Sequence, residues 1–266
     1  MEILFDILIV LFILVGAFIM KAEGFFKNVV NFILLYLASL LSSIFSTMLY
    51  NAFYKRLPFI NLIGKSQGIK IINVFLWRSI FFILIFSLIV VLVRQILSKT
   101  HINEKLEDDI STSGILSMVL SFIVSLASMV IIIFNLTIIF MFPMFGLKPL
   151  ANSKVQNAIV KNIPILYKAN ANFYANEKYA LNRLNKKDNT ADNYINVSDD
   201  IIDNMVYTEF LTTDMIEYFE DNDMLLEHRK ASTEKEYNDQ TSNTDTTSNN
   251  DSYPDNATKE DEVDER

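Results

Sequence analysis

The sequence ILSMVLSFIVSLASMVIIIFNLTIIFMF, residues 115–142, decides the fold of this chain. It is 28 residues long and contains no charged side chain. A helix of that length measures about 42 Å, whereas the hydrocarbon core of a bilayer is about 30 Å thick. Because hydrocarbon offers no hydrogen-bond partners, an uninterrupted apolar segment must satisfy its own backbone as a helix. The segment therefore predicts a membrane-spanning helix that tilts, bends or projects beyond the bilayer.

Three further apolar segments precede it, at residues 3–20, 29–49 and 74–93. Each is close to the roughly 20 apolar residues with which a helix crosses a bilayer. Hydrophobic residues make up 51% of the chain, a share that a soluble domain of this size would struggle to bury. We therefore predict an all-α fold, a four-helix transmembrane bundle, in a membrane domain of residues 1–170.

Charge divides the chain into two parts. Residues 1–187 carry 18 Lys and Arg against 8 Asp and Glu, whereas residues 188–266 carry 5 against 23. The acidic part cannot bind phosphate backbones, so we expect no nucleic acid as a partner. We predict a linker at 171–197, an acidic amphipathic helical segment at 198–228 and a mostly disordered acidic tail at 229–266.

Two polar segments after the last span are predicted to form helices. Ser153 is a plausible N-cap, and Pro164 a stop, for a short amphipathic helix on the membrane surface. Ser198, followed by two aspartates, suits the start of a second helix. The apolar residues at helical spacing in this second helix begin with Ile202, Met205, Val206 and Phe210.

The distribution of basic residues predicts the orientation. In the short flanks, seven Lys and Arg lie on the side of the two termini and five on the opposite side. No cleavage pattern follows the first span, so we expect it to remain as an anchor. Both termini are therefore expected to face the cytoplasm of a multi-pass plasma-membrane protein.

Small residues recur every four positions in two of the predicted spans. Such stripes let neighbouring helices approach closely, and their hydroxyl groups can add hydrogen bonds. Helix packing is the ordinary interpretation, and a polar surface lining a path is the alternative. The two stripes are Ser117, Ser121 and Ser125, and Ala38, Ser42 and Ser46.

Three strongly polar side chains lie within the predicted spans. Asp6 is one turn into the first span, where it can act at the helix N-terminus or have a functional role. Arg78 lies beside the only tryptophan and suits an interfacial anchor, or an ion pair with Asp6. Asn135 is expected to donate a hydrogen bond to another helix.

Residues that carry catalysis are not apparent. The sequence has no H-E-x-x-H, G-x-S-x-G or P-loop motif, and no cysteine. Its two histidines, His101 and His228, both lie in polar surroundings. We therefore expect no catalytic residues, no cofactor-binding residues, no metal ligands and no enzymatic activity.

Asp6 leads the first span, and Gly24, Phe25 and Lys27 form a G-F-x-[RK] element after it. The fourth span carries its serine stripe, and the segment 153–166 follows that span. Together these features resemble the CvpA (colicin V production) family of small four-helix bacterial inner-membrane proteins. The family usually has glycines where the fourth span has serines, and it has a similar terminal segment, so the resemblance covers about residues 1–167.

The resemblance implies a bacterial membrane protein that supports toxin or bacteriocin production, secretion or envelope maintenance through partner proteins. The alternative is a small transporter or channel subunit that works as an oligomer. Membrane lipid is an expected partner, a homo-oligomer is possible, and the acidic tail is expected to dock on other membrane or cytoplasmic proteins. Alternatively, the tail folds back on the chain's own basic loop at Lys55, Arg56, Lys65 and Lys70.

Overall fold

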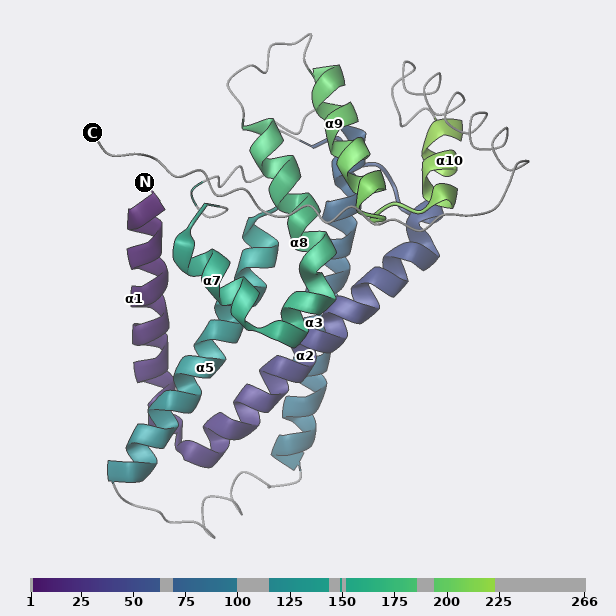
Figure 1. The fold of residues 1–266 in the computed structure, drawn as a ribbon. Coiled ribbons are helices and arrows are strands. Elements are labelled where there is room, and N and C mark those ends of the chain that lie inside the picture. The colour runs from purple at the N-terminus through teal and green to yellow at the C-terminus, as the bar shows by residue number, and fades with distance from the viewer. Residues whose placement is uncertain are drawn as a thin grey trace, which may run out of the picture. The chain divides into compact units, whose positions relative to one another are not determined.

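The computed structural model describes residues 2–62, 69–99, 115–143, 149, 152–185 and 194–222 (Figure 1). The chain divides into two compact units, Met1–Leu226 and Glu227–Arg266, and all the described residues belong to the first. Helices are the only regular structure in the described ranges. This result confirms the all-α prediction.

Four long helices carry the predicted spans. They are α1 (Glu2–Met20), α2 (Phe25–Phe53), α3 (Asn73–Lys99) and α5 (Ile115–Phe140). Each is long and apolar enough to cross a membrane, so the chain is a multi-pass membrane protein. Short 3₁₀ helices in the described ranges flank them: η1 (Lys21–Glu23), η2 (Tyr54–Arg56) and η4 (Lys70–Ile72).

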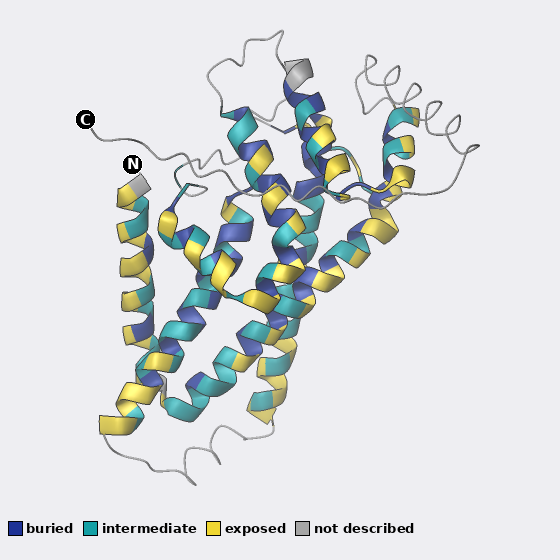
Figure 2. Ribbon diagram, viewed as in Figure 1, coloured by how far each residue is buried: buried dark blue, intermediate teal, exposed yellow. Residues whose placement is uncertain are grey.

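The helix α2 lies at the centre of the bundle. It packs against α3 and α5, and α5 in turn packs against α1. Most apolar side chains of α1 remain exposed, as the yellow colour along this helix in Figure 2 shows. Because hydrocarbon replaces water around a membrane span, these side chains form a lipid-facing surface.

Two consecutive helices, α7 and α8, follow the last span before the acidic segment. The first, α7 (Lys154–Asn162), has the predicted N-cap, since Ser153 Oγ accepts a hydrogen bond from the Gln156 amide at 3.0 Å. It packs against α1 and α5. It ends at Asn162, before Pro164, as the sequence predicted. Pro164 also opens the next helix, α8 (Pro164–Leu184). Proline is favoured at the first helical position because its missing N–H has no intrahelical partner there.

The predicted linker is in part helical, since α8 occupies its residues 171–184. The composition of the buried face of α8 explains why the sequence did not predict this helix. Asn170 and Glu177 belong to the same buried face as Phe173 and Leu181, so polar residues interrupt the apolar period in the sequence. Every residue of the face is nevertheless covered by neighbouring helices, and that packing stabilises α8.

The segment predicted as one acidic helix from Ser198 forms two helices. The first, α9 (Tyr194–Tyr207), begins before Ser198, which is buried inside it and is not its N-cap. The backbone reverses at Glu209, where φ is 53° and the Phe210 amide donates to the Met205 carbonyl at 2.8 Å. The second, α10 (Thr213–Asp221), follows.

The apolar face of α9 and α10 packs against the chain itself. Ile202 is fully buried in the common core, and Phe210 and Phe219 are nearly so. Tyr218 Oη donates a hydrogen bond to the Lys55 carbonyl at 2.8 Å. This arrangement corrects the expectation that this face docks on a partner, and it matches the alternative of folding back near Lys55. The acidic tail 229–266 lies outside the described residues.

Candidate functional site

A row of buried small and hydroxyl residues runs along α2. We name it the serine seam: Ala38, Ser39, Ser42, Ser43 and Ser46, all buried. The hydroxyls of Ser39, Ser42 and Ser43 each donate to the carbonyl four residues earlier, at 2.6–2.8 Å. Their donors are therefore satisfied within α2, and the oxygen lone pairs remain free to accept from neighbouring helices.

Two asparagines from other helices use these lone pairs. Asn135 of α5 donates from Nδ2 to Ser39 Oγ at 2.7 Å. Asn170 of α8 donates from Nδ2 to Ser43 Oγ at 2.7 Å. Asn135 thus lies in the interhelical position that the sequence analysis assigned to it. The partners Ser39 and Asn170 were missed, because sequence spacing does not say which helices become neighbours.

The serine stripe of α5 makes the second interhelical contact. Ser121 Oγ accepts from Asn28 Nδ2 at 2.8 Å and donates to the Lys21 carbonyl at 3.0 Å. Asn28 Nδ2 also donates to the Met20 carbonyl at 3.0 Å. Ser125 is buried as well, whereas Ser117, nearer the start of α5, is half-buried. The end of α1 and the starts of α2 and α5 are therefore joined by one hydrogen-bonded cluster.

The family-like element Gly24, Phe25 and Lys27 opens α2. Gly24 has a φ of 93°, which an L side chain rarely adopts, so glycine is required for this turn. The Phe25 and Phe26 rings pack edge to face with centroids 5.1 Å apart. Lys27 is half-buried. In this structure the element forms the turn between two spans and the first residues of α2.

The structure places Asp6 and Arg78 with different partners. The Asp6 carboxylate accepts from Ser153 Oγ and from the Val155 amide, the latter at 3.2 Å, at the N-terminus of α7. Arg78 donates from Nη2 to Thr47 Oγ1 on α2. The predicted ion pair between Asp6 and Arg78 is therefore not formed. The physical reason is that α1 packs on α5 and α7, whereas α3 packs on α2.

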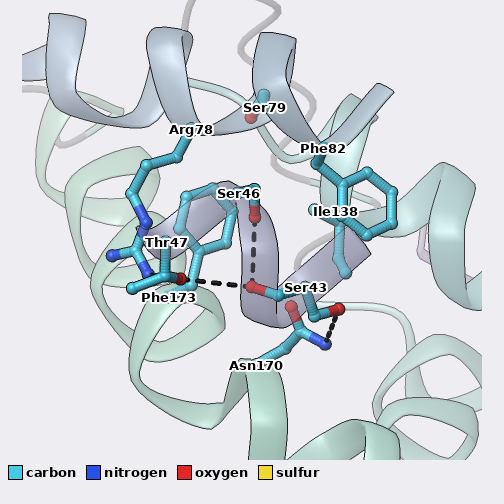
Figure 3. Close-up of a pocket in the computed structure, with 9 residues that line it drawn as sticks. All are labelled: Ser43, Ser46, Thr47, Arg78, Ser79, Phe82, Ile138, Asn170 and Phe173. Atoms are coloured by element: carbon cyan, nitrogen blue, oxygen red, sulfur yellow. Dashed lines mark hydrogen bonds between the residues drawn. The ribbon is translucent and has the colours of Figure 1, made fainter. Parts of the chain in front are cut away.

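Arg78 lies in a small cavity between spanning helices and α8 (Figure 3). We name it the Arg78 pocket. Its volume is about 10 Å³, close to the space that one water molecule needs. The guanidinium carbon lies 4.4 Å from the ring centroid of Phe210 and 5.2 Å from that of Phe173. The lining residues are Ser43, Ser46, Thr47, Arg78, Ser79, Phe82, Ile138, Asn170 and Phe173.

The α8 helix carries a buried carboxyl group that the sequence analysis did not single out. Glu177 is fully buried, and within the described part of the chain neither carboxyl oxygen has a hydrogen-bond partner. Burial raises the pKa of Glu177 well above its usual value, because desolvation disfavours the charged form. Tyr174, one turn earlier, donates to Asn157 Oδ1 at 2.9 Å, and burial raises its pKa as well.

The hydrogen bonds described above hold helices of the bundle together. Among the described residues, no three His, Cys, Asp or Glu side chains lie close enough together to hold a metal ion. A search of family models, curated proteins and solved structures gives no match to this chain. The function must therefore be inferred from the bundle and its polar contacts.

Proposed function

We propose that this protein is a non-catalytic membrane scaffold of the CvpA type. In this role it supports toxin or bacteriocin production, secretion or envelope maintenance through partner proteins. It resides in a bacterial plasma membrane with both termini in the cytoplasm, and its acidic tail recruits the partners. One observation carries the proposal: three asparagines inside the bundle each donate a hydrogen bond to a serine of another helix.

The interior contacts support a packed bundle over a passage. Asn135, Asn170 and Asn28 each donate to a serine of another helix, at 2.7–2.8 Å. A side chain that lines a water-filled path keeps its polar hydrogens free for the solute, whereas these amide groups donate theirs to a neighbouring helix. The side-chain oxygens of Asn28 and Asn135 are buried and have no partner among the described residues, so no solvent reaches them in this packing. Such a rigid bundle is suited to presenting a binding segment at the membrane.

An oligomeric transporter or channel subunit is the second candidate, and a different observation favours it. The apolar groove between α1 and α5 has a volume of about 380 Å³. Phe5, Phe12 and Phe140 are among the residues that line it. A helix of a second copy in this groove would enlarge the bundle, and a passage could then form between copies.

Two measurements on the purified full-length protein separate these candidates. In proteoliposomes, a scaffold gives no potassium or proton flux above that of protein-free vesicles, whereas a transporter or channel subunit gives flux that rises with protein content. In cells, photocrosslinking of the full chain should recover partners that a chain ending at Leu226 does not. This end point follows the boundary between the two units and retains α8, α9 and α10.

A matched control tests the charge of the tail. Replacing the Asp and Glu residues after position 226 by Asn and Gln keeps the length but removes the charge. Partner recovery should fall as it does for the shortened chain, because recruitment is assigned to the acidic side chains. Flux in vesicles, or equal partner recovery from all three chains, would refute the scaffold proposal.

A further inference from the structure

The guanidinium of Arg78 has no acidic partner in the described part of the chain. Its one hydrogen bond there goes to the neutral Thr47 hydroxyl, and the pocket is lined without a carboxylate. Two aromatic rings, Phe173 and Phe210, lie on the guanidinium and shield part of it from water. A desolvated cation without a counterion is costly, so this site favours an anion.

Ser79 provides a second and independent indication of a ligand. Its side chain is only 6% exposed, and its hydroxyl has no hydrogen-bond partner among the described residues. It lines the same cavity as Arg78 and lies next to it on α3 (Figure 3). Buried hydroxyls are normally hydrogen-bonded, so an acceptor in the cavity would satisfy this one.

The pocket lies at the boundary of the membrane domain. Arg78 is in the second turn of α3, and the exposed apolar side chains of α3 begin only at Ile83. Phe173 and Phe210, which cover the guanidinium, come from α8 and from the turn after α9, outside the four spans. The neighbouring Trp77 donates from its indole to the Pro58 carbonyl at 3.0 Å. Tryptophan and arginine concentrate at the depth of lipid headgroups, so we infer that the pocket lies at this depth.

We propose that Arg78 and Ser79 bind an anionic oxygen of a phosphate group. The cavity has room for one oxygen atom of the phosphate. The rest of the phosphate group stays outside the cavity, where it can still contact Arg78 because this side chain is only half-buried. Arginine matches phosphate because its planar donors bind adjacent oxygens. A membrane lipid supplies this group at headgroup depth, and free phosphate supplies it from water. The proposal does not depend on the scaffold function.

The test is the melting temperature of the full-length protein in an uncharged detergent. The probes are short-chain phosphatidic acid, diacylglycerol with the same chains, sodium phosphate, and sodium chloride at matched ionic strength. Phosphatidic acid should raise the melting temperature, because a ligand that binds only the folded state stabilises it. Diacylglycerol and chloride should not. A rise with sodium phosphate but not with phosphatidic acid would assign the bound phosphate to the aqueous phase.

Three variants locate the site. Arg78→Gln should weaken phosphate binding about tenfold or more, because it removes a charge-assisted hydrogen bond. Arg94→Gln, on an exposed part of the same helix, should respond as the natural protein does. Ser79→Ala should leave the ligand-free melting temperature unchanged, since the hydroxyl has no partner to lose, yet bind phosphate more weakly.

Ser79→Ala keeps the test decisive if Arg78→Gln fails to fold. A full phosphate response in Ser79→Ala would contradict the proposal, as would one in a folded Arg78→Gln variant. An equal shift with chloride, or with diacylglycerol, would also overturn it, because neither ligand presents a phosphate oxygen.

Discussion

Asn135 of α5 donates a hydrogen bond to Ser39 Oγ of α2 across 2.7 Å, and both side chains are buried. Ser39 in turn donates to the carbonyl of Leu35, so one chain of hydrogen bonds joins the side chain of α5 to the backbone of α2. In hydrocarbon no water can replace either bond. This contact therefore fixes which faces of the two helices meet.

Replacing Asn135 by Leu should destabilise the membrane domain by about 0.6–2 kcal/mol, the range for hydrogen bonds between membrane helices. Reversible unfolding in detergent measures the loss. Ser39→Ala alone should cost a similar amount, and the double variant should cost less than the sum because both substitutions remove the same bond. Strict additivity of the two losses would mean that the side chains do not interact.

Ile202 and Val206, one turn apart on α9, should respond differently to truncation. Ile202 is fully buried, so Ile202→Ala should cost about 2–5 kcal/mol and release α9 and α10 to proteases. Val206 is 37% exposed, and Val206→Ala should have little effect. Limited proteolysis of the two variants compares them directly. Equal protection would show that this face does not pack on the bundle.

Glu177 should make the stability depend on pH. Its pKa in the folded state is raised by burial, whereas in an unfolded chain glutamate titrates near pH 4.3. Between these two pKa values the folded state retains a proton that the unfolded state has lost, so the free energy of unfolding falls as pH rises.

The variant Glu177→Gln should remove that decline and raise the melting temperature above about pH 5, because the neutral amide does not ionise. Exposed Glu217 provides the control, and Glu217→Gln should keep the pH dependence of the natural protein. A pH profile of Glu177→Gln that parallels the natural one would place the effect elsewhere.

The natural absence of cysteine allows a direct test of topology. With both termini in the cytoplasm, cysteine introduced for Lys105 should react with an impermeant maleimide in intact cells. Cysteine introduced for Lys65 or Glu260 should react only after the cells are opened. The reverse pattern would invert the orientation inferred from the seven-to-five excess of basic residues.

The four spans were predictable because each is an apolar segment that hydrocarbon forces into a helix. Asn135 was predictable as an interhelical donor, since an amide in the middle of a span has few hydrogen-bond partners other than a neighbouring helix. The helix α8 was not, because Asn170 and Glu177 interrupt the apolar period of its buried face. The stripe becomes visible only when these two residues are counted with Leu166, Phe173 and Leu181.

The sequence also could not show which side chains and helix faces contact one another. Asp6 and Arg78 have opposite charges and lie in different spans, which suggested a pair. The order of helices in the bundle separates them, since α1 and α3 pack on different neighbours. Likewise the apolar face of α9 was recognisable, but periodicity alone does not tell whether such a face meets a partner or its own chain.

The most direct test of the packed bundle is the reactivity of cysteine placed in the serine seam. In membranes, cysteine introduced for Ser39 or Ser43 should resist a small water-soluble methanethiosulfonate reagent, because these positions are closed by Asn135 and Asn170. Cysteine introduced for Lys65, in a connection between spans, should react fully in opened cells. Rapid modification at Ser39 and Ser43 would show that water reaches the seam, and would contradict the scaffold in favour of a passage.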